Sequence, residues 1–85
     1  MAYVVVYEGR PTNRDLERQN WQQDLSRYRL QPQFLEAGEV LTIALPEHDA
    51  WVYLALLEMR YWEERQDIER QRIGERIVQL AEQLC

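Results

Sequence analysis

Residues 50–62 read AWVYLALLEMRYW, and this stretch has enough continuous apolar surface to organise the whole fold. It is too short to span a membrane, which takes about 20 apolar residues. Its apolar side chains lie all round a helix, whereas a helix at the surface of a monomer has one apolar stripe and one polar face. The stretch therefore predicts a buried helix that more than one partner covers.

Strand and helix patterns alternate on the N-terminal side of this stretch. A run of β-branched and aromatic residues over 2–7 predicts a strand. A capping sequence and a narrow apolar stripe predict a helix over 13–30, which Pro32 stops because the residue before a proline avoids helical backbone angles. The alternating pattern over 39–45 predicts a second strand, and the residues between Leu30 and this strand are interpreted as a loop.

Both predicted strands are apolar on both faces, so neither face is expected to meet water. If the helix over 13–30 crosses over between the strands, they are parallel and form a right-handed β-α-β unit. The antiparallel arrangement is the alternative. Because a lone pair of strands is rarely stable, we expect the pair to be covered by the C-terminal helix, extended by a second copy of the chain, or both.

The C-terminal half predicts one long helix over 47–84. Pro46 is well placed at the helix start. Four apolar residues near the end have the spacing of a coiled-coil seam: Ile73, Ile77, Leu80 and Leu84. The polar stretch before them contains no proline and no turn cluster, which favours a continuous or gently kinked helix. In the alternative, the chain bends near 66–74 and the last helix folds back on the main one.

Together these patterns predict an α+β fold, predominantly helical, in a single domain over residues 1–85, in which a small β-α-β unit precedes a long, continuous or kinked C-terminal helix. A domain of 85 residues buries only about 60% of the surface of its unfolded chain, so we expect marginal stability and a homodimer. The predicted interface residues are the large apolar side chains of the main helix and of the seam: Trp51, Leu54, Tyr61, Trp62, Ile73, Ile77, Leu80 and Leu84.

The charge distribution excludes two classes of partner. The formal net charge is -5, and Arg60 is the only basic residue between residues 36 and 64, where the acidic residues gather. A nucleic-acid-binding protein normally has a basic stripe that neutralises phosphates, and an anionic membrane surface also attracts basic segments. We therefore expect neither nucleic acid nor a membrane as a partner.

Two features predict a cytoplasmic protein. Cys85 is the only cysteine, so no intramolecular disulfide can form, and disulfides are rare in reducing compartments. The N-terminal residues MAYVVVYEG have neither the basic leader nor the long apolar core of a signal peptide.

No arrangement of chemically active residues predicts catalysis. Ser26 and His48 lie on different predicted elements, which argues against a Ser-His-Asp triad. Glu47, His48 and Asp49 are consecutive, so their side chains diverge around the helix start and do not predict a metal site. The scattered glycines form no phosphate-binding loop. We expect no enzymatic activity, no metal and no cofactor.

The leading hypothesis is a small non-enzymatic adaptor, regulator or assembly factor that acts through its apolar C-terminal helix. Its expected partners are a second copy of itself and another, unidentified protein. The alternative is an acidic inhibitor that occupies the nucleic-acid-binding groove of another protein. That function requires carboxylates in rows like those of phosphates, whereas here large apolar residues interrupt them.

Overall fold

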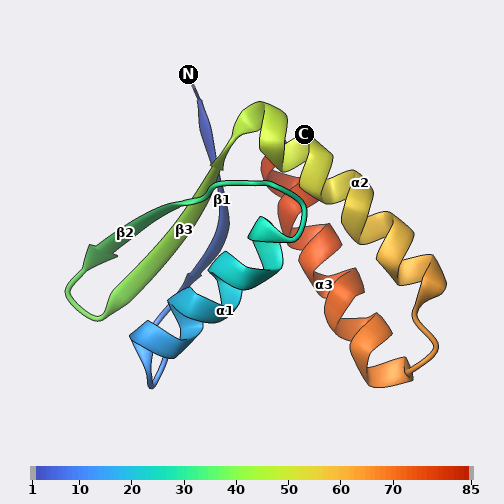
Figure 1. The fold of residues 1–85 in the computed structure, drawn as a ribbon, viewed down its shortest axis with the longest axis horizontal. Helices are drawn as coiled ribbons and strands as arrows, with labels where there is room; N and C mark the ends of the chain where they lie inside the picture. Colours follow the sequence, from blue (N-terminus) through green and yellow to red (C-terminus); the bar gives the residue numbers. More distant parts are fainter. Residues whose placement is uncertain (1, 85) are drawn as a thin grey trace.

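The computed structural model describes residues 2–84 and shows an α+β fold with a three-stranded antiparallel sheet and three helices (Figure 1). The predicted fold class, α+β with a predominance of helix, is confirmed. The elements are β1 (Tyr3–Gly9), α1 (Arg14–Ser26), β2 (Gln33–Ala37), β3 (Val40–Pro46), α2 (Glu47–Glu63) and α3 (Asp67–Leu84). Cys85, the subject of the prediction about disulfides, lies outside the described residues.

The strand order in the sheet is β1-β3-β2, and the central strand β3 is antiparallel to both neighbours. The two predicted strands therefore pair in the antiparallel arrangement, which was the alternative to a parallel pair. The helix α1 instead connects β1 to β2, and these two strands run in the same direction with β3 between them. The β-α-β unit is thus present in its split form.

The strand β2 lies in a segment for which the sequence predicted a loop. Gly38 has a φ of 63° in the two-residue turn between β2 and β3, a backbone conformation that glycine adopts without strain and that suits a tight hairpin. The sequence of β2 lacks the alternation of apolar and polar residues that indicates a strand. Phe34 and Leu35 are both apolar, although only Phe34 packs on the core and Leu35 is half-exposed. Pairing with β3, more than the composition of β2, makes this segment a strand.

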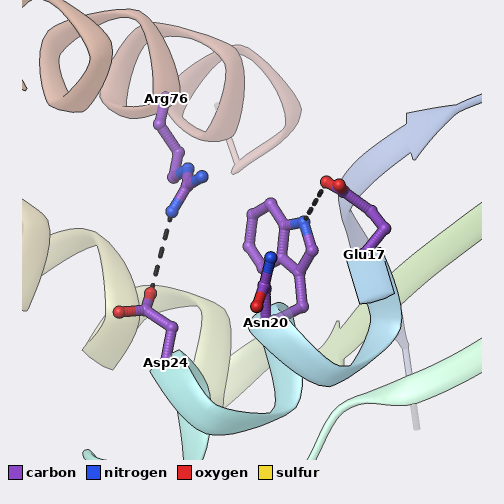
Figure 2. A pocket seen from close by; sticks show the side chains of 5 residues that line it. Glu17, Asn20, Asp24 and Arg76 are labelled. Carbon is purple, nitrogen blue, oxygen red and sulfur yellow. Dashed lines mark hydrogen bonds and ion pairs between the residues drawn. The ribbon is translucent and has the colours of Figure 1, made fainter. Parts of the chain in front are cut away.

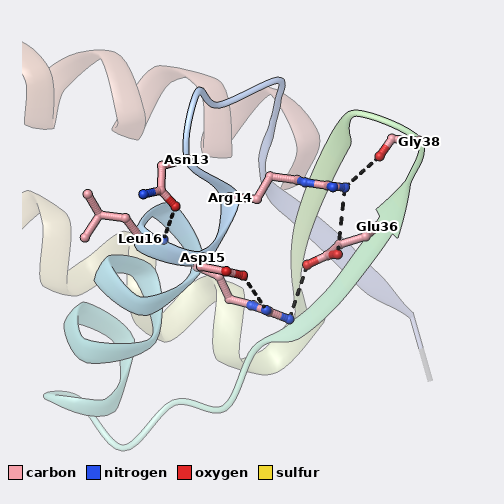
Figure 3. A network of polar contacts seen from close by, with 7 residues as sticks. Asn13, Arg14, Asp15, Leu16, Glu36 and Gly38 are labelled. Carbon is pink, nitrogen blue, oxygen red and sulfur yellow. Dashed lines mark hydrogen bonds and ion pairs between the residues drawn. The ribbon is translucent and has the colours of Figure 1, made fainter.

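Two arginines of α1 hold the β2–β3 hairpin (Figure 3). Arg14 Nη1 donates to the Gly38 carbonyl at 2.6 Å, and Arg18 Nη1 lies 3.2 Å from Glu36 Oε1. Asn13 caps the start of the helix, since its side chain accepts a hydrogen bond from the Leu16 N–H at 3.1 Å. Exposed ion pairs contribute at most about 1 kcal/mol each, so these contacts mainly fix the orientation of the hairpin.

The helix α1 ends at Ser26, earlier than the predicted end at residue 30. Arg29 has a φ of 62°, and the Leu30 N–H donates to the Leu25 carbonyl at 3.0 Å. A left-handed residue with such a bond is a common way for a helix to close before the chain turns. The turn allows Leu30 to be buried together with Trp21 and Leu25.

The helices pack on one face of the sheet. On β3, alternate side chains are fully buried and belong to one core with the helices: Leu41, Ile43 and Leu45. The opposite face carries Tyr3 and Leu35, which pair with Pro46 and Thr42 of β3 and are half-exposed. The expectation that both faces of the strands are covered therefore fails for the face away from the helices.

The predicted helix over 47–84 is interrupted at residues 64–66, so the alternative in which the chain folds back describes the structure (Figure 1). Glu64 has extended backbone angles, and its carboxylate accepts hydrogen bonds from the N–H groups of Arg65 and Gln66, both at 3.0 Å. The Arg70 guanidinium donates back to the Glu64 carbonyl, at 3.1 Å from Nε. These side chains cap the break, which is why no proline or glycine marks it in the sequence.

The residues of the predicted seam explain why the fold-back is favoured. Ile73 and Leu80 are buried in the same core as Leu57, and Ile77 and Leu84 pack against it. Burying one such side chain contributes about 1.5–3 kcal/mol, whereas each helical hydrogen bond lost at the break costs only about 1 kcal/mol. The seam is therefore used within the chain.

We predict that Leu80→Ala lowers the free energy of unfolding by about 2–5 kcal/mol, because it leaves a cavity between α3 and the core. Ile68→Ala, which truncates an exposed side chain of the same helix, is the matched control and should change it by less than about 0.5 kcal/mol. Urea unfolding followed by circular dichroism measures both. Equal effects, or a cost of Leu80→Ala that appears only at high protein concentration, would contradict packing within one chain.

Candidate functional site

A cluster of polar side chains joins the three helices. Figure 2 shows its contact between Asp24 of α1 and Arg76 of α3. Asp24 of α1 accepts hydrogen bonds from the Tyr53 hydroxyl at 3.4 Å and from Arg60 Nη1 at 3.3 Å, both of which are on α2. Arg76 of α3 donates to the Tyr53 hydroxyl at 2.9 Å and lies 3.7 Å from Asp24 Oδ2. We call Asp24, Tyr53, Arg60 and Arg76 the Asp24 cluster.

The Asp24 cluster borders a hollow of about 260 Å³ between α1 and α3. The Arg76 guanidinium lies 4.1 Å from the centre of the Trp21 ring, and the Trp21 indole N–H donates to Glu17 at 3.2 Å. A cation over the face of an indole is attracted to it. Each charged group that lines the hollow thus contacts another residue of its lining. These contacts hold α1 against α3.

Two members of the Asp24 cluster, Tyr53 and Arg60, keep their protons at neutral pH. Burial raises the pKa of Tyr53 to about 12, an effect that Arg76 partly opposes and Asp24 reinforces. Burial of Arg60 is the largest single effect and opposes its charge, but Asp24, Tyr28 and Tyr53 together outweigh it and raise the pKa of the guanidinium. A group that transfers protons in catalysis usually has a pKa near the working pH, and neither of these groups does.

A different surface has the character of a binding site: the outward side of α2. Five apolar side chains there are exposed, and they share one stripe at helical spacing: Trp51, Val52, Ala55, Met59 and Trp62. We call these residues the outer face of α2. The opposite side of the helix is buried and includes Tyr53 and Leu57. The helix is therefore apolar on two opposite sides, and the described chain covers only one of them.

An apolar groove between α2 and α3 adjoins the outer face. One hollow, of about 450 Å³, is lined by Glu58, Tyr61, Trp62, Gly74, Ile77 and Val78. A second, of about 530 Å³, shares three of these residues, namely Tyr61, Gly74 and Val78. We call the two hollows together the α2–α3 groove. A Cβ atom at Gly74 would lie 3.3 Å from Tyr61 Cε2, so the glycine allows the tyrosine ring to lie close against α3.

The structure separates the predicted interface residues into two groups. Trp51 and Trp62 are exposed, and Tyr61 and Ile77 line the groove. The others are buried in the core or packed against it: Leu54, Ile73, Leu80 and Leu84. The predicted interface did not include Val52, Met59 and Val78. A helical projection of the sequence places Met59 on the same stripe as Trp51 and Trp62, so this residue could have been predicted.

Two carboxylates on which the acidic-inhibitor hypothesis depends have partners within the chain. Glu36 pairs with Arg18, and the Glu64 carboxylate accepts hydrogen bonds from the N–H groups of Arg65 and Gln66 ahead of α3. Both are therefore unavailable as members of a phosphate-like row. His48, whose side chain is largely exposed, lies 3.5 Å from Asp49.

Residues 2–84 contain neither a cluster of metal-binding side chains nor a membrane-spanning helix. In this range no group of three or more His, Cys, Asp or Glu residues is placed to hold a metal ion. No helix in the same range is long and apolar enough to cross a membrane.

We predict that Tyr53 makes the protein less stable in alkali. Its phenol ionises above about pH 10 in the unfolded chain and only above about pH 12 in the folded protein. In this interval the folded state binds more protons, so the free energy of unfolding falls as the pH rises. The fall should reach about 2 kcal/mol at pH 11.5, at about 1.4 kcal/mol per pH unit.

Urea unfolding at pH 9 and pH 11.5 measures this loss. Tyr53→Phe should lose about 2 kcal/mol less than the wild type over the interval. Tyr3→Phe removes a half-exposed phenol on the open face of the sheet and should retain the wild-type decrease. If Tyr53→Phe and the wild type lose the same stability, the phenol is not buried as described.

Comparison with known proteins identifies no relative. No protein family matches the sequence, no curated protein resembles it, and no solved structure matches its fold. The function is therefore inferred from the chemistry and geometry of this chain.

Proposed function

We propose that this protein is a small non-enzymatic protein–protein interaction protein that binds its partner through the outer face of α2 and the α2–α3 groove. The observation that carries the proposal is the exposure of large apolar side chains along one stripe. Trp62 is 80% exposed, Met59 58% and Trp51 46%. Single exposed apolar residues are ordinary, whereas a contiguous apolar patch usually marks a site of interaction.

The types of residue support this proposal. Tryptophan and methionine are enriched in protein interfaces, and tryptophan is prominent among the residues that contribute most binding energy. The outer face combines both types, since Met59 lies between Trp51 and Trp62 on the stripe. The groove beside it adds concave apolar surface that can receive a side chain of the partner.

The amount of exposed surface is also consistent with a missing partner. The accessible surface of the chain is 6190 Å². A compact monomer of its mass, 10.3 kDa, would expose about 5,400 Å². The excess is about 800 Å², which equals the area that each partner buries in a standard protein interface. Binding through the outer face would reduce the exposed area of the chain to about that of an ordinary compact protein.

The Asp24 cluster supports binding indirectly, because it fixes the position of α2. Tyr53 and Arg60 lie on the inward side of this helix and are held by Asp24 from α1 and, for Tyr53, by Arg76 from α3. A surface that is already rigid loses less conformational entropy when it binds. We place this function in the cytoplasm, where a protein with a single cysteine needs no disulfide for its stability.

We predict that Met59→Glu abolishes complex formation, because it places a charge in the centre of the outer face. Ile68→Glu makes the same change at an exposed position of α3 outside this face, and it should have no effect. Affinity capture from cell extract and light scattering over a range of concentrations report complexes with another protein and with a second copy, respectively. If every complex of the wild type persists with Met59→Glu, the proposed function is contradicted.

A further inference from the structure

The chemistry of the α2–α3 groove identifies the kind of partner. We propose that the groove binds an amphipathic helix that carries Lys or Arg residues beside its apolar stripe. This inference rests on the proposed function, since it names the partner of the same surface. It follows from the shape of the groove, from the charges at its rim and from the net charge of the chain.

The shape of the groove suits a helix. The groove lies between two helices that pack side by side (Figure 1). Its two hollows adjoin each other at Tyr61, Gly74 and Val78. Val78, which is 56% exposed, and Gly74 belong to both hollows. An amphipathic helix binds such a groove by inserting apolar side chains spaced three and four residues apart. A third helix in this position would cover Val78 and Trp62 together.

The rim of the groove is acidic. Glu58 lines one hollow and Glu75 the other, and the lining residues include no Lys or Arg. Within residues 2–84 neither carboxylate takes part in an ion pair. Arg70 lies 5.8 Å from the centre of the Tyr61 ring, but its guanidinium is hydrogen-bonded to the Glu64 carbonyl. Basic residues beside the apolar stripe of a partner would therefore meet unpaired negative charge.

The same charges disfavour a second copy of the chain as the occupant. A two-fold symmetric contact places the same surface on both partners. Glu58 and Glu75 would then lie near their own counterparts, in a protein whose net charge is already -5. Like charges brought together at an interface weaken it, whereas opposite charges speed association and select the partner. A basic helix satisfies both the apolar groove and its acidic rim.

Two synthetic peptides test the inference with the full-length protein. Both carry the same stripe of Leu and Trp residues at helical spacing, and the positions beside the stripe are Lys in one peptide and Glu in the other. Fluorescence anisotropy of a dye on each peptide gives the dissociation constants. We expect the Lys peptide to bind at least tenfold more tightly, and added salt to reduce the difference.

Two sets of variants separate the groove from the overall charge of the protein. Glu58→Gln with Glu75→Gln should reduce the preference for the Lys peptide at least threefold. Val78→Asn removes apolar contact without a change in charge, and it should weaken binding at least tenfold. Ile68→Asn makes the same kind of change outside the groove and should leave binding unchanged. Circular dichroism checks that each variant retains its helices.

Three results would overturn the inference. The first is equal binding of the Lys and Glu peptides or no binding of either, and the second is equal behaviour of Val78→Asn and Ile68→Asn. The third is a wild-type dimer that Val78→Asn dissociates, since a second copy would then occupy the groove. That dimer would leave the proposed function intact. Complexes that persist with Met59→Glu would refute the proposed function itself.

Discussion

The fold depends on the burial of the inward side of α2. Tyr53 and Leu57 on this side are almost completely buried, and they belong to the same core as Ile43 of the sheet and Ile73 of α3. A domain of this size has little apolar surface to spare, so an uncovered inner side would leave it unfolded. The return of α3 at residues 64–66 supplies this cover, and the caps around Glu64 make the return possible without a proline or glycine.

Because one side of α2 is buried, its opposite side faces the solvent. The helix is apolar all round, and the sheet and α3 occupy only its inner half, so Trp51, Met59 and Trp62 remain exposed. The Asp24 cluster then holds the helix at two residues, Tyr53 and Arg60, without contacting this surface. Core and proposed binding surface are thus opposite sides of one rigid helix, which is why the fold can present an apolar stripe and remain ordered.

The candidate site was predictable in part. The composition of α2 indicated that more than one partner covers it, and Trp51 and Trp62 were expected at an interface. Ile73 and Leu80 were expected at an interface, but they are buried in the core of the chain. Their spacing is the same whether they contact a second copy or α2 of the same chain. Spacing along a helix specifies which side is apolar, but the covering element is decided by the path of the chain.

The sequence by itself determined the fold class, the approximate positions of β1, α1 and β3, and the excess of apolar surface on α2, because these follow from local periodicity and composition. Only the tertiary structure decided three further features: the strand β2, the antiparallel order around β3 and the break after Glu63. Each depends on contacts between residues distant in the sequence. The edge of β3 makes β2 a strand, and the burial of Ile73 and Leu80 compensates for interrupting a helix that local propensity would continue.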